Sequence, residues 1–267
     1  MKYIFFLMAS LLLAGCAQVP RYEWVYEKNI SLDGISPVGL VVTENGIWIA
    51  DSDHNRIVKT DFSGQILESY DDLQRPMHLG YYENTLYFPE YSSDTIRTLK
   101  NGNMSFIGIP EEPDAPAGVE VAENLVAVAD FYNGRIILQK DGNNKTFGKK
   151  GSQPGELNYP TDVQWMNNQL YVADAYNHRV QVFDENGKVL KVIGEAEKMN
   201  AATGLFVADN HLVVTDFENN RVLTYTPEGE LKHLIKEHLD KPVDVYIYKD
   251  KLYVANYKGK SIAIFKL

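Results

Sequence analysis

Residues 170–183 read LYVADAYNHRVQVF, and this stretch decides the fold because its pattern recurs along the chain. An alternating apolar run ends on an acidic residue or Asn, and a polar turn and a second alternating run follow it. The acidic or Asn position occurs at Asp51, Glu90, Asp130, Asp174, Asp216 and Asn256. The steps between these positions are 39, 40, 44, 42 and 40 residues. A period of this length indicates a chain built from structural repeats.

A second mark, Pro followed three residues later by an apolar residue, lies upstream of each run. It begins at Pro37, Pro76, Pro116, Pro160 and Pro242, and the fifth unit has Ala202 instead. Each unit thus contains four short strands separated by turn signals, without a helical period, which is typical of a β-propeller blade. The last unit ends after three strands, and the alternating residues 22–27 can supply the fourth. The sequence therefore predicts an all-β, six-bladed β-propeller of four-stranded antiparallel blades over residues 22–267, closed by an N-terminal strand.

The fourth unit carries a family pattern in its most complete form. Its elements are Phe147-Gly148, Pro154-Gly155, Leu157, Pro160, Tyr171-Val172-Ala173-Asp174, Asn177-His178-Arg179-Val180, Gly187 and Ile193-Gly194. This unit resembles the NHL repeat, and thinner copies cover nearly all of the chain after residue 36. The resemblance implies a six-bladed propeller. It implies little about chemistry, because this fold is found in enzymes and in binding proteins alike.

The N-terminus has the pattern of an export signal. Lys2 precedes an apolar run over residues 4–14, which is too short to cross ~30 Å of hydrocarbon as a helix. The run ends Leu13-Ala14-Gly15-Cys16, which resembles the bacterial lipobox. That resemblance implies a signal peptide over residues 1–15, lipidation of Cys16, and a tether over residues 16–21. The alternative is an ordinary secretory signal, which would leave an unpaired thiol in an oxidising compartment.

A lipidated Cys16 implies a bacterial cell-envelope protein with the membrane as one partner. Residue 17 is Ala and not Asp, and by resemblance to the enterobacterial sorting rule this favours the periplasmic side of the outer membrane. The composition excludes another class of partner. Lys and Arg number 26 against 36 Asp and Glu, so the net charge of −10 disfavours nucleic-acid binding.

The position two residues after the Pro alternates between glycine and a polar residue. It is Gly39, His78, Gly118, Asp162, Gly204 and Asp244 in chain order. Alternate blades of a six-fold ring are related by ~120°, so the three polar side chains should converge at one mouth of the central channel. Two carboxylates ~6 Å apart repel by roughly 3 kcal/mol at an effective dielectric constant of ~20. A divalent metal ion held by His78, Asp162 and Asp244 would relieve that repulsion. The alternative is that both aspartates hydrogen-bond nearby backbone and that His78 is incidental.

This arrangement resembles two families of propeller enzymes. Amidating lyases hold zinc with three channel histidines, whereas here one of the three residues is His. In the gluconolactonase family, carboxylates and an Asn hold the metal, and the Glu of the first blade has no clear counterpart in this chain. No nucleophile elbow, phosphate loop or Cys–His pair is present in the sequence, and catalytic residues stay unassigned.

Four units share an Asp-Asn-Arg set in the turn after the second strand, which we interpret as structural because it is common to blades. Units two and six lack the Asn-Arg part, and their turns suggest a binding face that comprises Glu90, Tyr91, Asp94, Asn256 and Tyr257.

Two function classes remain. The sequence favours a binding or scaffold protein that recognises a protein, peptide or glycan in the envelope. The alternative is a metal-dependent lyase or lactonase that acts at the channel mouth.

Overall fold

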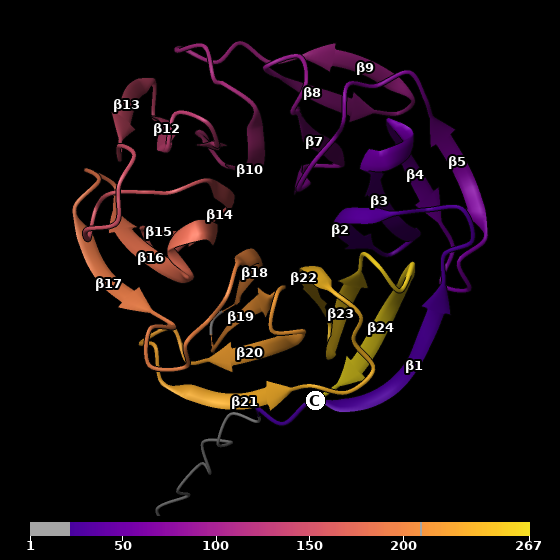
Figure 1. Cartoon of the computed structure of the whole chain (residues 1–267). Coiled ribbons are helices and arrows are strands. Elements are labelled where there is room, and N and C mark those ends of the chain that lie inside the picture. Colours follow the sequence, from indigo (N-terminus) through magenta and orange to yellow (C-terminus); the bar gives the residue numbers. More distant parts are fainter. Residues whose placement is uncertain (1–21, 209) are drawn as a thin grey trace, which may run out of the picture.

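The computed structural model describes residues 22–208 and 210–267, which form six four-stranded antiparallel sheets around a central axis (Figure 1). Blade 1 contains β2 (Pro37–Thr43), β3 (Gly46–Asp51), β4 (Arg56–Thr60) and β5 (Ile66–Tyr70), and blade 2 contains β6 (Gly80–Tyr82), β7 (Thr85–Glu90), β8 (Thr95–Lys100) and β9 (Asn103–Phe106). Blade 3 contains β10 (Pro116–Ala122), β11 (Leu125–Asp130), β12 (Arg135–Lys140) and β13 (Asn143–Phe147). The predicted six-bladed propeller is therefore confirmed.

The remaining blades follow the same order from the axis outward. Blade 4 contains β14 (Pro160–Met166), β15 (Gln169–Asp174), β16 (Arg179–Asp184) and β17 (Val189–Ile193), and blade 5 contains β18 (Ala202–Ala208), β19 (His211–Asp216), β20 (Arg221–Tyr225) and β21 (Leu231–Ile235). Blade 6 contains β22 (Pro242–Tyr248), β23 (Lys251–Asn256), β24 (Ser261–Lys266) and, at its outer edge, β1 (Val25–Ser31). Two 3-10 helices, η1 (Ser52–His54) and η2 (Ala175–Asn177), lie in the turns after β3 and β15.

The ring is closed by antiparallel pairing of β1 with β24. The strand begins at residue 25 and not at 22, because Trp24 leaves the edge of blade 6 and packs on blade 5. Its indole Nε1 donates to Thr224 Oγ1 at 3.0 Å, and its backbone N–H donates to His233 Nδ1 at 2.8 Å. The predicted closing strand is thus confirmed, with its span corrected to Val25–Ser31.

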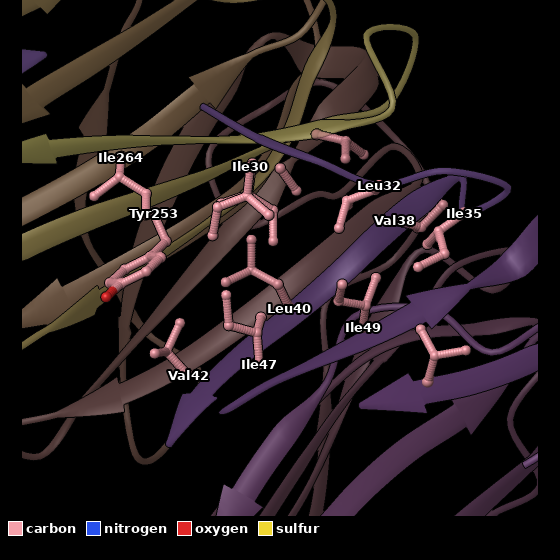
Figure 2. Close-up of a cluster of buried hydrophobic side chains, with 14 residues drawn as sticks. Ile30, Leu32, Ile35, Val38, Leu40, Val42, Ile47, Ile49, Tyr253 and Ile264 are labelled. Atoms are coloured by element: carbon pink, nitrogen blue, oxygen red, sulfur yellow. The ribbon is translucent and has the colours of Figure 1, made fainter. Parts of the chain in front are cut away.

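The hydrophobic core is divided into clusters between neighbouring blades. Figure 2 shows the cluster at the closure, where Ile30 of β1 packs among Leu40, Ile49 and Ile264 from blades 1 and 6. Because strand side chains alternate between faces, each blade offers apolar residues to both neighbours. The burial of each such side chain contributes ~1.5–3 kcal/mol to the free energy of folding.

The propeller has two distinct ends. On one, which we call the entry face, the inner strands begin and the turns after β3, β7, β11, β15, β19 and β23 lie beside them, because Pro37 pairs with Asp51 and the other blades repeat this register. On the opposite end, the hairpin face, each inner strand turns back into the second strand of its blade.

The predicted signal peptide, tether and Cys16 lie outside the described residues. Within the described part, no helix has the length and apolar content that a membrane crossing requires.

Candidate functional site

His78, Asp162 and Asp244 meet on the axis near the entry face. Asp162 and Asp244 lie on β14 and β22, and His78 lies just before β6. All three residues are buried, and one ligand atom from each lies within 4.8 Å of the others. The structure thus brings together the three side chains whose convergence the glycine alternation predicts. We call them the axial triad.

The glycines of the odd-numbered blades make this convergence possible. A Cβ atom on Gly118 would lie 2.8 Å from the Cα of Asp162, and one on Gly204 would lie 2.7 Å from the Cα of Asp244. A Cβ on Gly39 would lie 2.8 Å from the Cα of His78. Only a residue without a side chain permits so close an approach of two backbones. Each glycine therefore lets the next blade bring its polar residue to the axis.

The two aspartates tie neighbouring blades together. Asp162 accepts hydrogen bonds from Val163 N at 2.8 Å and, across the blade boundary, from Leu205 N at 2.9 Å. Asp244 repeats the arrangement, with Val245 N at 2.8 Å and Leu40 N of blade 1 at 2.8 Å. These contacts support a structural role for both carboxylates, one of the alternatives that the sequence leaves open. Each carboxylate oxygen still has a second lone pair for another ligand.

His78 is held differently. Its backbone N–H donates to Ala117 O of blade 3 at 3.0 Å, which takes it out of register with its own blade. Its Nδ1 atom lies 3.5 Å from Asp244 Oδ1 but has no hydrogen bond within the described structure. A buried nitrogen without a hydrogen bond is costly, so its orientation toward two carboxylates indicates a place for a proton or a cation.

The charges of the triad are coupled. Burial alone would lower the pKa of His78, but the carboxylates of Asp244 and Asp162 outweigh it and raise the pKa. Burial raises the pKa of Asp162 to about 7, with the positive charge of His78 opposing and Asp244 adding to the rise. The triad therefore retains protons near neutral pH, and a bound cation would have to displace them.

A further acidic residue, Glu120 of β10, lies next to the triad and was not among the predicted site residues. Burial and the nearby Asp162 raise the pKa of its carboxyl group to about 8, although a hydrogen bond from Trp165 N opposes the rise. Gln164 makes the equivalent bond one blade later, to Val207 N at 2.6 Å. The signal in the sequence was a lone acidic residue in an otherwise apolar inner strand.

The predicted binding face divides into buried and surface residues. Glu90 and Asn256 are buried and replace the repeated Asp, because they accept the N–H groups of Gln74 and Asp240 at 2.9 and 3.1 Å. The side chains of these two residues are therefore buried within the fold and are not exposed on the predicted face. Asp94 Oδ1 accepts Ala115 N at 2.7 Å and links blade 2 to blade 3.

The repeated acidic residues have the structural role that the sequence predicts. Asp174 is fully buried, and its carboxylate accepts Asn158 N at 2.7 Å, Asn177 Nδ2 at 2.8 Å and Arg179 Nε at 2.9 Å. In blade 4 the Asn that bonds to the repeated Asp lies three residues after it. In blade 1 that position is His54, whose Nδ1 lies 2.7 Å from Asp51 Oδ1.

Tyr91 and Tyr257 remain at the surface of the entry face, and Tyr91 is part of a larger set. The other members, Phe131, Tyr132, Tyr159 and Tyr176, were not predicted. Neighbouring ring centroids along the set lie 4.7–5.7 Å apart. Tyr132 and Tyr176 are 41% and 59% exposed. We call these five residues the aromatic arc. The available signal was the aromatic residues one or two positions after Glu90, Asp130 and Asp174, together with Tyr159 directly before Pro160.

Comparison with known proteins agrees with this geometry. The NHL repeat family matches residues 157–183, within and just before blade 4. The chain is a six-bladed β-propeller that contains an NHL repeat. RING finger protein nhl-1 of Caenorhabditis elegans is 36% identical over 75 residues, which are 26% of this chain and 8% of that protein. Protein brain tumor of Drosophila melanogaster is 26% identical over 157 residues, 56% of this chain and 15% of that protein. The NHL propeller thus matches less than a sixth of the length of either relative.

Solved structures show the same fold at low sequence identity. A catalytically inactive virginiamycin B lyase from Staphylococcus aureus with quinupristin has a TM-score of 0.66 at 15% identity, covering 92% of this chain and 100% of that chain. A streptogramin B lyase has a TM-score of 0.64 at 17% identity, covering 92% and 86%. The WD40 propeller domain of Doa1 has a TM-score of 0.68 at 13% identity, covering 91% and 97%. At these identities the likeness concerns the fold.

Proposed function

We propose that this NHL propeller is an exported, lipid-anchored protein of the bacterial envelope that binds a protein or peptide partner through the aromatic arc. The observation that carries the proposal is the arc itself, with five packed aromatic rings on one face, of which Tyr132 and Tyr176 are exposed. Contiguous exposed apolar surface marks interaction sites, and Tyr is enriched in the central residues of protein interfaces. A Tyr-rich surface also offers hydroxyl groups for the rim of an interface.

The proposed anchor can be tested separately from the binding face. Two or more acyl chains on Cys16 would hold the protein stably on a membrane, since each buried methylene contributes ~0.8 kcal/mol. Replacement of Cys16 by Ser should then move the protein from the outer-membrane fraction to the soluble periplasmic fraction. An unchanged distribution would contradict the proposed anchor without affecting the proposed binding face.

The binding face can be tested by photo-crosslinking in cells from positions 132 and 176. The matched control is position 190, where Leu190 is as exposed as Tyr132 (42% against 41%) but lies on β17, the outermost strand of blade 4, and not in a turn of the entry face. We expect one discrete adduct from 132 and 176 and none from 190. Once the partner is purified, Tyr176→Ala should weaken its binding about tenfold, and Leu190→Ala should not. Equal adducts at all positions, or unchanged affinity, would contradict the proposal.

A second candidate function, a metal-dependent lyase or lactonase at the channel mouth, is favoured by His78 Nδ1, which is buried without a hydrogen bond 3.5 Å from Asp244 Oδ1. His78, Asp162 and Asp244 would hold a divalent cation, which would polarise a substrate carbonyl. We include a lyase among the candidates because the fold is similar to that of virginiamycin B lyase. The three ligand atoms lie within 4.8 Å of one another, so a single cation could contact all of them.

Metal binding is measurable without a substrate. The protein should be titrated with Mg²⁺, Ca²⁺ and Zn²⁺ while its melting temperature is followed, because a ligand that binds only the folded state stabilises it. His78→Ala should abolish the metal-induced rise in melting temperature. The control is His54→Ala, which replaces a more exposed histidine in the turn after β3 and should retain the rise. The same melting temperature with and without each metal would contradict this candidate function.

A further inference from the structure

A ligand-sized cleft lies on the hairpin face, at the end of the propeller opposite to the aromatic arc. It has a volume of about 750 Å³ and opens between blades 1 and 2, with β22 of blade 6 at its inner end. Sites for small molecules are clefts of ~300–1,000 Å³ that combine apolar walls with a few polar groups. The cleft is therefore large enough for one or two sugar rings.

Five aromatic residues contribute to its walls. Trp48 of β3 and Tyr70 of β5 face the cleft from blade 1, with ring centroids 6.2 Å apart. Tyr81 of β6 lies across from them in blade 2, and Tyr246 and Tyr248 of β22 line the inner end. Such rings offer flat apolar surface to a ligand that has its own apolar face.

The rim supplies groups that both donate and accept hydrogen bonds. Asn45, Asn84 and Asn101 lie in the hairpin turns around the opening. The Oδ1 atom of Asn84 accepts the Tyr81 hydroxyl at 3.2 Å, so its NH₂ group is available. Within the described structure, no hydrogen bond is found for the hydroxyls of Tyr246 and Tyr248. A side-chain amide presents a donor beside an acceptor, which matches the paired hydroxyl groups of a sugar.

The charges in the cleft are largely neutralised within the wall. Lys59 Nζ lies 3.1 Å from Glu68 Oε1 and 5.1 Å from the ring centre of Trp48. The Tyr70 hydroxyl donates to Glu68 Oε2 at 2.7 Å. The remaining charged residue of the lining is Glu44, which is acidic. The cleft therefore offers no unpaired cation to an anionic ligand. Burial raises the pKa of Tyr246 to about 12, and its hydroxyl stays a donor at neutral pH.

We propose that this cleft is a binding site for an uncharged saccharide of one or two rings. The C–H face of a sugar ring would contact Trp48 and Tyr81, and its hydroxyls would bond to Asn84 and Tyr246. The combination of aromatic walls, convergent amides and no free cation carries the inference. It goes beyond the proposed function, because this site lies on the opposite face and does not involve the arc or the axial triad.

The test uses the folded protein and three disaccharides, cellobiose, maltose and diacetylchitobiose, at millimolar concentration. Saturation-transfer NMR should show contact with at least one of them, and tryptophan fluorescence should shift on binding. Trp48→Phe should remove the fluorescence response. Trp165→Phe is the matched control, because Trp165 also has a lysine over its ring, Lys140 at 5.9 Å, but does not line the cleft.

Quantitative variants separate a binding role from a structural one. Trp48→Ala should weaken saccharide binding at least tenfold, and the conservative Tyr246→Phe should weaken it severalfold with the melting temperature unchanged. Glucuronate and glucosamine serve as charged probes and should bind more weakly than the uncharged sugars. The proposal is overturned if none of the three disaccharides binds, if Tyr246→Phe and Trp48→Ala bind as the wild type does, or if a charged probe is preferred.

Discussion

Blades 4 and 2 have the same four-stranded plan but differ in how completely their polar groups are satisfied. In blade 4, Arg179, Asn177 and Gln181 all bond to the buried carboxylate of Asp174. In blade 2, Glu90 replaces this Asp and Arg97 approaches it at 3.4 Å. Of the three buried side-chain polar atoms that lack a hydrogen bond in the described structure, two belong to blade 2, His78 Nδ1 and Arg97 Nε.

The inner strand of blade 2 is also less regular than that of blade 4. The inner strand of blade 4, β14, has seven residues, whereas β6 of blade 2 has three. His78 lies outside β6, and Tyr91 and one wall of the saccharide cleft also come from blade 2. A blade that follows the repeat closely contributes stability, and a blade that departs from it contributes unsatisfied groups. Departures from a repeat are therefore the better guide to function in such a fold.

The largest expected effect comes from the ion pair of blade 4. Arg179→Met would leave the fully buried Asp174 without its cation, and we expect a loss of about 3–5 kcal/mol in the free energy of unfolding. The matched change in blade 2, Arg97→Met, should cost about 1 kcal/mol, because Arg97 is partly exposed and its contact with Glu90 is long. Urea unfolding of both variants measures the difference. Equal losses would contradict the contrast between the blades.

The glycines of blades 1 and 3 test the difference between blades 2 and 4, because each packs against the backbone of the next blade. Gly118→Ala would place a Cβ 2.7 Å from Thr161 O and 2.8 Å from the Cα of Asp162, in a segment that two hydrogen bonds of Asp162 fix. We expect a loss of about 3 kcal/mol, at the upper end for overpacking. Gly39→Ala makes similarly close contacts with residues 77 and 78, which lie outside β6, and should cost about 1 kcal/mol as that segment shifts.

Gly108→Ala is the control for both variants, since a Cβ there would meet no atom within 4 Å. Its melting temperature should stay close to that of the wild type. If Gly39→Ala destabilises the protein as strongly as Gly118→Ala does, then residues 77 and 78 are as firmly held as blade 4 and the comparison fails.

The sequence predicts the features that depend on repetition and misses those that depend on distant contacts. The recurring positions of Asp51 to Asn256 predict the blades, and the glycine alternation predicts that His78, Asp162 and Asp244 meet. The start of β1 was misplaced because it depends on the bond between Trp24 and Thr224, 200 residues away in the chain. The bonds of both aspartates to the next blade, and the cleft between blades 1 and 2, likewise require knowledge of which atoms face each other across a blade boundary.

The third comparison concerns Glu120, which joins blade 3 to blade 4 at a position where blade 2 has Gly80. Because the folded-state pKa is raised from 4.5 to about 8, the folded protein binds a proton that the unfolded chain releases. Stability therefore falls as the pH rises from 4.5 to about 8 and is constant above it. Each pKa unit corresponds to ~1.4 kcal/mol, and because Glu120 is half-buried we expect about 2 kcal/mol in total.

Glu120→Gln should remove this dependence, since Gln164 already makes the equivalent bond in the next blade. The variant should match the wild type at pH 4.5 and be about 2 kcal/mol more stable at pH 8.5, as urea unfolding at the two pH values would show. A variant that is less stable than the wild type at pH 8.5 would mean that the ionised carboxylate contributes to the closure of blades 3 and 4. In that case the acidic residues near the axis stabilise the ring as anions, and the case for a cation beside them becomes stronger.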